Sequence, residues 1–234
     1  MLQFFAASQD KEKYADATGY LFHSKFNKQN TRILQVFRAQ VNDTGRNASL
    51  FSMNTDGSGL QQCLSAEKWN HIARLGGSGN HPNWHPDGEH VIMNCVPAWL
   101  GLNDMLFCRF RFDGSDFTIL SEKHLGSGHP SVSTSGKYLL ADAYPKQSYV
   151  GAADGEVAIR LINLQNDTEL LLCTIPNDVG GGVKQALPED KITGGSQHKL
   201  DPHPCWNRQS NQICFNGAPG GRRQVFIADL KNIL

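Results

Sequence analysis

Residues 197–204, Gln-His-Lys-Leu-Asp-Pro-His-Pro, contain three side chains of the types that bind metals in proteins. His198, Asp201 and His203 are separated by three and then two positions, and an extended chain with this spacing can place all three around one ion. Imidazole nitrogens with a carboxylate suit Mn²⁺, Zn²⁺ or Fe²⁺ rather than the all-oxygen cage that Ca²⁺ prefers. The segment therefore predicts a metal site, although it matches no stringent zinc motif such as Cys-x-x-Cys.

Three His-Pro pairs begin segments of the chain that align with one another. The segments are "HPNWHPDGEHVIMN" from His81, "HPSVSTSGKYLLAD" from His129 and "HPCWNRQSNQICFN" from His203. Each has an extended stretch, a polar turn and an apolar strand, and a weaker fourth copy begins at Tyr20. Proline favours extended backbone in the residue before it, so a histidine at this place can be purely structural. Three of them at equivalent places, with His198 and Asp201 close by, favour a functional cluster.

The elements around these segments are predicted to be β-strands. Further β-rich runs follow each segment and end in Asp-Gly or Asn-Asp turns, for example "SLFSMNTDGSG" and "MLFCRFRFDGSD". Such turns between apolar runs are typical of β-hairpins. Because helical periodicity is nowhere sustained, we predict an all-β fold, a β-propeller of four-stranded antiparallel blades. The predicted blades cover residues 19–66, 79–122, 128–175 and 200–234, and the chain stops before a fourth strand of the last blade.

The segments "HPNWHPDGEHVIMN" and "LFSMNTDGSG" closely resemble the TolB-type, WD40-like propeller repeat, in which a Pro-x-Trp-Ser-Pro-Asp-Gly turn precedes an apolar strand. The resemblance extends from about Tyr20 to Leu230. Two arrangements remain open: "MLQFFAAS" at the start supplies the missing strand and closes a small ring, or the chain is the C-terminal part of a larger propeller. We favour the second, because a chain that begins within a repeat needs further blades to cover its exposed edge.

In propellers of this type the first strand of each blade lines the central channel. The resemblance therefore implies that His81, His129 and His203 converge on one mouth of the channel, whereas the turn at residues 85–88 lies on the opposite face. The other histidines are expected in turns or on the surface, and these are His23, His71, His85, His90 and His124.

The set of histidines resembles that of the oligogalacturonate lyases, a pectin-degrading family with a seven-bladed propeller. In this family three histidines and a glutamine bind the metal, which is typically Mn²⁺. The resemblance implies that His129 is the first ligand, and that His198, Asp201 and His203 stand at the positions of the glutamine and the other two histidines. Two of the four residue types differ from the family pattern, although both replacements can bind a metal. Gln197, one position away, is an alternative to His198.

The same resemblance implies the catalytic residues. His81 stands where the family has its base, Arg46 is nearest to the place of the family's arginine, and Arg222 and Arg223 can meet an anionic sugar from the last blade. β-Elimination of a uronate removes the proton at C5, next to the carboxylate, and expels the 4-linked sugar. A divalent metal stabilises the developing charge, neutral imidazole accepts the proton, and arginine binds a carboxylate through two N–H groups. The expected partner is thus an acidic oligosaccharide, and the cofactor a divalent metal, Mn²⁺.

The overall composition gives no support for nucleic acid or a membrane as a partner. Lys and Arg number 22, as do Asp and Glu, so the net charge is zero and gives no support for nucleic-acid or anionic-membrane binding. No apolar run approaches the roughly 20 residues of a membrane span, and we expect no signal peptide and a cytoplasmic location.

The six cysteines are expected to be mostly small buried residues, with Cys205 and Cys214 a reduced pair across a hairpin.

Two other functions remain open beside the lyase. The first is a non-catalytic TolB-like propeller that binds proteins or ligands, in which the histidines are structural. The second is a related carbohydrate-active or peptidase-associated propeller, whose active residues lie in sequence outside this chain.

Overall fold

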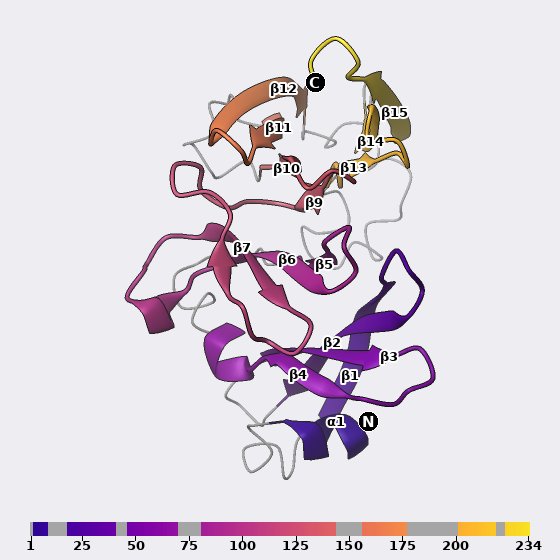
Figure 1. Ribbon diagram of the computed structural model, residues 1–234, viewed down its shortest axis with the longest axis vertical. Helices are drawn as coiled ribbons and strands as arrows, with labels where there is room; N and C mark the ends of the chain where they lie inside the picture. The colour runs from indigo at the N-terminus through magenta and orange to yellow at the C-terminus, as the bar shows by residue number, and fades with distance from the viewer. Residues whose placement is uncertain are drawn as a thin grey trace, which may run out of the picture. The chain divides into compact units, whose positions relative to one another are not determined.

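The secondary structure of the chain is almost entirely antiparallel β-sheet (Figure 1). The computed structural model describes residues 2–8, 18–40, 46–69, 81–143, 156–176, 201–218 and 223–234. They form four antiparallel sheets, and the predicted all-β fold with propeller-type blades is confirmed. The chain divides into two compact units, residues 1–126 and 127–234, with two sheets each. No helix in the described part of the chain is long and apolar enough to cross a membrane.

The first sheet has four strands in sequence order. They are β1 (Thr18–Phe26), β2 (Arg32–Gln40), β3 (Arg46–Asn54) and β4 (Gln61–Leu64). A short helix, α1 (Leu2–Ala7), precedes them, and the buried Phe4 packs against the rings of Phe37 and Phe51. The start of the chain is therefore helical and does not supply the missing strand of the last blade, as one of the two predicted arrangements required. A single turn of helix brings Phe4 onto two apolar rings, and this contact rather than strand pairing covers the short apolar run.

The second sheet also has four strands in sequence order. They are β5 (Asn83–Trp84), β6 (His90–Cys95), β7 (Leu106–Arg111) and β8 (Thr118–Ile119), with the 3₁₀-helix η3 (Ala98–Leu100) after β6. Strand β6 is buried at every residue after His90, so both of its faces are covered, and the buried residues include the polar Asn94. Leu34 and Leu50 of the first sheet pack in one core with Val91 and Met93 of the second, and all four are fully buried.

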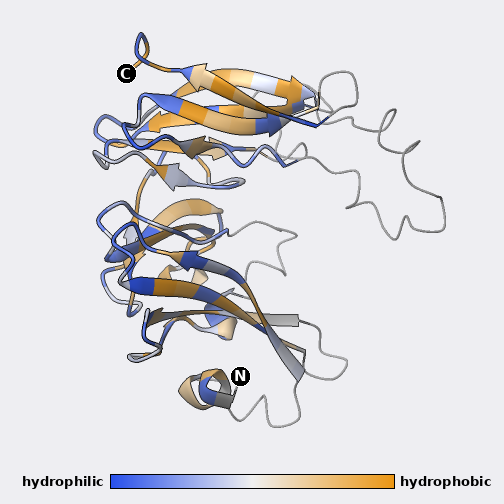
Figure 2. Ribbon diagram, turned by 90° about the vertical axis from the view of Figure 1, so that its right-hand side faces the viewer, coloured by the Kyte–Doolittle hydropathy of each residue, from blue (hydrophilic) through white to orange (hydrophobic). Residues whose placement is uncertain are grey.

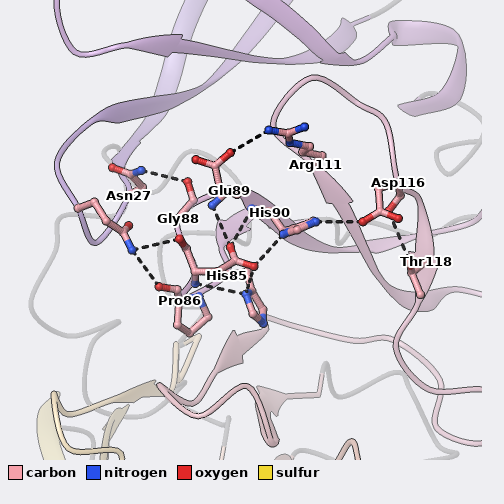
Figure 3. A network of polar contacts seen from close by, with 11 residues as sticks. Asn27, His85, Pro86, Gly88, Glu89, His90, Arg111, Asp116 and Thr118 are labelled. Carbon is pink, nitrogen blue, oxygen red and sulfur yellow. Dashed lines mark hydrogen bonds and ion pairs between the residues drawn. The ribbon is translucent and has the colours of Figure 1, made fainter.

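The carboxylate of Asp87 holds the turn between β5 and β6 together. Figure 3 shows the polar contacts around this turn, with His85, Glu89 and His90 labelled. Oδ1 of Asp87 accepts the backbone N–H groups of Glu89 and His90, both at 2.9 Å. Its Oδ2 lies 2.8 Å from Nδ1 of His85 and 2.7 Å from Nδ1 of His90, and the other ring nitrogen of His90 lies 3.1 Å from Oδ2 of Asp116. His85 and His90 are therefore turn residues bonded to carboxylates, as predicted.

Replacing Asp87 by alanine should lower the free energy of unfolding by about 1 kcal/mol at pH 7, because two backbone N–H groups lose their acceptor. Burial acts to raise the pKa of Asp87, but hydrogen bonds from the backbone of His90 and Glu89 and from the His90 ring outweigh it and lower the pKa to about 2. The carboxylate thus contributes its full stabilisation of the fold when the pH is above 3.8, the pKa that aspartate has in the unfolded chain. This contribution is lost as the pH falls through about 2, the pKa in the folded chain.

Urea denaturation of the wild type and the Asp87→Ala variant between pH 7 and pH 3 measures this difference, with the exposed Asp104→Ala as the matched control. The difference should be constant down to about pH 4 and smaller at pH 3. Equal stabilities at pH 7, or a difference that grows toward pH 3, would contradict the assignment.

Similar aspartate turns follow β3 and β7. Asp56 accepts the N–H of Ser58 at 2.9 Å, and Asp113 accepts the N–H of Ser115 at 3.0 Å. The glycine after each of these aspartates has a positive φ, which L-residues with a side chain rarely adopt. The Asp-Gly hairpins predicted from the sequence are thus present in both sheets of the first unit. Figure 2 shows the resulting pattern, with apolar residues concentrated in the strands and many hydrophilic residues in the turns.

The third sheet has four strands in the order β12-β11-β10-β9. They are β9 (Ser131–Val132), β10 (Tyr138–Asp142), β11 (Glu156–Asn163) and β12 (Thr168–Pro176). Strand β11 is buried along most of its length and includes Arg160, which is 2% exposed. Its guanidinium donates two hydrogen bonds to the carboxylate of Glu169, at 2.9 and 2.7 Å, which compensate the burial of the charge.

The fourth sheet has three strands in sequence order. They are β13 (Cys205–Trp206), β14 (Gln212–Gly217) and β15 (Gln224–Asp229). Leu140 and Ile159 of the third sheet share a buried core with Ile213 of the fourth. Nε1 of Trp206 donates a hydrogen bond to the carbonyl oxygen of Ser131, at 3.1 Å, and so connects β13 to β9. The first strands of these two sheets are therefore neighbours, which also brings the residues that precede them together.

Candidate metal centre

Three of the predicted metal ligands, His129, Asp201 and His203, lie together in the second unit. Each offers one ligand atom, a ring nitrogen or a carboxylate oxygen, and the three atoms all lie within 4.8 Å of one another. His129 lies just before β9, and the other two lie just before β13. The contact between these two strands thus accounts for the cluster.

Asp142, the last residue of β10, orients the imidazole of His129. Its Oδ1 accepts the backbone N–H of His129 at 2.6 Å, and its two carboxylate oxygens lie 3.0 and 2.9 Å from Nδ1 of the ring. Because the carboxylate bonds to Nδ1, Nε2 is the ring nitrogen that is placed to bind a metal. A carboxylate in this position fixes the tautomer of a ligating histidine and makes it a better ligand.

Asp142 also contacts the second histidine segment. Its Oδ2 accepts the backbone N–H of His203 at 3.3 Å, although the carboxylate itself is almost completely buried. Burial acts to raise the pKa of Asp142, but the hydrogen bonds from the ring and backbone of His129 and from the backbone of His203 outweigh it and lower the pKa. The carboxylate is therefore ionised at neutral pH, and one buried negative charge connects both histidine segments.

The segment that carries Asp201 is held by β14. The backbone N–H of Asn216 donates to the carbonyl oxygen of Pro202 at 2.8 Å, and its side-chain amide donates to that of Asp201 at 3.4 Å. The rings of His129 and His203 stack with their centroids 3.4 Å apart and their planes 25° from parallel. His129 is buried, Asp201 is half-buried and His203 is exposed, so the cluster is open to solvent on the His203 side.

Backbone conformation at the cluster is unusual at two positions. Gly128 has a φ of +53°, and a Cβ there would collide with the carbonyl oxygen and the side chain of Asp142, so only glycine fits. His203 has a φ of +48°, which costs about 1 kcal/mol or more for a residue with a Cβ. Such strain is typical of binding sites, because the surrounding contacts hold the side chain where the ligand requires it.

The donor set fits a divalent metal. Two imidazoles and one carboxylate are the protein ligands of many Fe²⁺ sites, and they leave coordination positions open for water or substrate. A divalent metal with two neutral imidazoles and the Asp201 carboxylate would carry one positive charge, which the ionised carboxylate of Asp142 behind His129 balances. The residues present therefore support a metal centre with open coordination positions. Because two of the three donors are nitrogen atoms, the site does not suit Ca²⁺, which prefers oxygen ligands.

The remaining predicted site residues are distributed over both units. His81 belongs to the first unit, lies just before β5, is half-buried and has its ring 6.3 Å from the ring of His23. Arg223 belongs to the second unit, lies just before β15 and is exposed. Three predicted features lie outside the described part of the chain: His198, Arg222 and the side chain of Arg46.

Asp142 is the residue of the candidate metal centre that was not predicted from the sequence, although the sequence contains a signal for it. Each of the three aligned segments begins with histidine and ends with a polar residue thirteen positions later, namely Asn94, Asp142 or Asn216. In the third sheet Leu140 pairs with Ser131, and this register continues to place Asp142 opposite His129. In the second unit both of these polar residues contact a histidine segment, since Asp142 bonds to His129 and Asn216 bonds to Pro202.

Comparisons with known proteins give similarity at the level of the fold. No protein-family model matches the sequence, and a search of curated proteins finds no match. Among solved structures, the chain is similar to an oligogalacturonate lyase from Vibrio parahaemolyticus, with a TM-score of 0.56 and 15% identity, over 90% of this chain and 49% of that one. It is also similar to TolB from Acinetobacter baumannii, with a TM-score of 0.52 and 13% identity, over 92% of this chain and 55% of that one.

A third similar structure is an acylaminoacyl peptidase from Pyrococcus horikoshii, with a TM-score of 0.50 and 9% identity, over 85% of this chain and 28% of that one. The chain thus spans about half the length of the lyase and TolB structures. Because one fold serves a lyase, TolB and a peptidase, function must be argued from the site. What these similarities establish is that the chain has the TolB-like β-propeller fold.

Proposed function

We propose that this chain is a metal-dependent lyase that cleaves oligogalacturonides, acidic oligosaccharides derived from pectin, by β-elimination. The observation that supports this most is the cluster of His129, Asp201 and His203 with the buried Asp142 behind it. The cluster occurs on a fold similar to that of an oligogalacturonate lyase. We propose Mn²⁺ as the metal, with His198 as a fourth ligand.

The protein side of the metal centre has three tasks. His129, Asp201 and His203 provide ligands from two segments, and Asp142 keeps the proton of His129 on Nδ1 so that Nε2 can bind. When bound, the metal supplies positive charge at the uronate carboxylate and so stabilises the negative charge that develops beside it. The exposed side of the cluster, at His203, is where the substrate carboxylate would enter.

His81 is the proposed base. It would accept the proton from C5 of the uronate, and the electron pair of that C–H bond would form the C4=C5 double bond as the C4–O bond breaks. The leaving sugar oxygen would keep the electron pair of the C4–O bond and take a proton from water. Imidazole is half neutral near pH 6.5, so it can act as a base close to neutral pH. Arg46, Arg222 and Arg223 are the proposed ligands of the sugar carboxylates, which they would bind through paired N–H groups.

The unsaturated product absorbs ultraviolet light, so absorbance measures the reaction of the chain with digalacturonate and Mn²⁺. The wild type should give a steady increase, and His81→Ala should lower the rate by roughly 100-fold or more, the typical contribution of a general base. His124→Ala, a matched change in the same unit, should keep the rate. No product from the wild type, or an undiminished rate in His81→Ala, would contradict the proposal.

A second candidate function is a non-catalytic binding scaffold, which the similarity to TolB supports. In that case the histidines are structural. Added Mn²⁺, Zn²⁺ or Fe²⁺ would then leave the melting temperature unchanged, and digalacturonate would give no product. A rise of the melting temperature with metal separates the lyase from the scaffold before any substrate is added.

A further inference from the structure

Cys205 and Cys214 lie directly opposite each other on β13 and β14. They are paired in the register of the two strands, their sulfur atoms are 3.1 Å apart, and both are free thiols. Opposite residues of an antiparallel pair have Cα atoms about 4.5–5.5 Å apart. A disulfide needs a Cα separation of about 4.4–6.8 Å, so these two sulfurs can bond without a shift of the backbone.

The exposure of this pair distinguishes it from the other cysteines. Cys205 is exposed and Cys214 is half-buried, so a small molecule in solution can reach the sulfurs. Cys63, Cys95 and Cys108 are buried, and Cys173 is half-buried like Cys214 but has no cysteine opposite it on the neighbouring described strand. Burial raises the pKa of Cys63 to about 12 and that of Cys205 to about 11, so the pair is distinguished by the exposure of Cys205 and by its facing sulfur atoms.

We propose that Cys205 and Cys214 form a reversible disulfide when the chain meets a small-molecule disulfide such as oxidised glutathione. One cysteine thiolate attacks the reagent and releases one glutathione thiolate, which leaves glutathione bonded to that cysteine. The other cysteine then attacks the protein sulfur of this mixed disulfide and releases the second glutathione. Two protein thiols are oxidised, one reagent disulfide is reduced to two thiols, and the two protons pass to the released glutathione.

The position of the pair gives the bond a structural effect. The segment with Asp201 joins β14 through the hydrogen bonds of Asn216, and Cys205 begins β13 two residues after His203. A disulfide would add a covalent link between the same two segments. The oxidised chain should therefore melt roughly 5 °C higher than the reduced chain, and this holds whether or not the cluster binds a metal.

The test is mass spectrometry of the full chain after incubation with oxidised and reduced glutathione at several ratios. Free thiols are alkylated with N-ethylmaleimide and the chain is digested with trypsin, which cleaves after Arg208, between the two cysteines. The oxidised wild type should show the two resulting peptides joined by a disulfide, with Cys63, Cys95 and Cys108 alkylated only after denaturation. The joined peptides should separate when reductant is added.

Two variants make the result specific. Cys205→Ser should lose the joined peptides and retain one glutathione on Cys214, whereas Cys173→Ser should still form them. The proposal is overturned if both cysteines are alkylated at every ratio, or if either one bonds to Cys173 instead. The wild-type measurement needs no variant, so a folding defect in Cys205→Ser does not affect the conclusion.

Discussion

Replacing His203 by alanine should weaken the binding of a divalent metal by at least about 100-fold. Loss of a residue that only supports a ligand typically costs 10- to 100-fold in metal affinity, and loss of one of three clustered ligands should cost more. Because His203 is exposed, its removal should leave the core intact and change the free energy of unfolding without metal by less than about 1 kcal/mol. Isothermal titration with Mn²⁺ and Zn²⁺ measures the affinity.

The positive φ at His203 calls for a second variant. Asparagine tolerates this backbone conformation better than alanine, so His203→Asn separates loss of the imidazole from strain in the chain. Both variants should bind the metal at least about 100-fold more weakly, and His124→Ala should bind it as the wild type does. Unchanged affinity in His203→Ala would remove this residue from the metal centre.

Replacing Asp142 by asparagine should affect both stability and metal affinity. The buried carboxylate accepts hydrogen bonds from the ring and backbone of His129 and from the backbone of His203, and the neutral amide can replace only part of them. Bonds to a charged acceptor are the stronger ones, so we expect a loss of about 2 kcal/mol in the free energy of unfolding. Metal affinity should fall roughly 10- to 100-fold, because the tautomer of His129 is no longer fixed.

Urea denaturation and metal titration of Asp142→Asn measure the two effects separately. Asp104→Asn, the same change at an exposed carboxylate, should alter the free energy of unfolding by less than about 0.5 kcal/mol and leave the affinity unchanged. If Asp142→Asn loses stability but binds metal as the wild type does, Asp142 supports the fold and not the metal centre.

The fold could be predicted from the sequence because its repeat is visible. The three His-Pro segments and the Asp-Gly turns predict antiparallel sheets, and four such sheets are observed. The helix over Leu2–Ala7 could not be predicted, since a short apolar run is compatible with helix or strand. The helical conformation is stabilised by the contact of Phe4 with Phe37 and Phe51, and these residues lie far along the chain.

The candidate site was predictable where its residues are close in sequence or equivalent in the repeat. Asp201 and His203 are two positions apart, and the repeat places His129 at the equivalent position of the neighbouring sheet. The aligned segments place a polar residue at position 142, but only the register of β9 and β10 in the structure shows that it lies opposite His129. The strain at His203 depends on contacts between sheets, so it too is known only from the structure.

Pulsed electron paramagnetic resonance of the chain with one equivalent of Mn²⁺ tests most directly whether His129, Asp201 and His203 bind a metal. Ligating imidazole nitrogens couple to the electron spin of the ion, and water ligands give no such coupling. We predict nitrogen coupling in the wild type and its loss in the double variant His129→Ala/His203→Ala. A wild-type spectrum like that of Mn²⁺ in buffer, or nitrogen coupling that persists in the double variant, would contradict the metal centre.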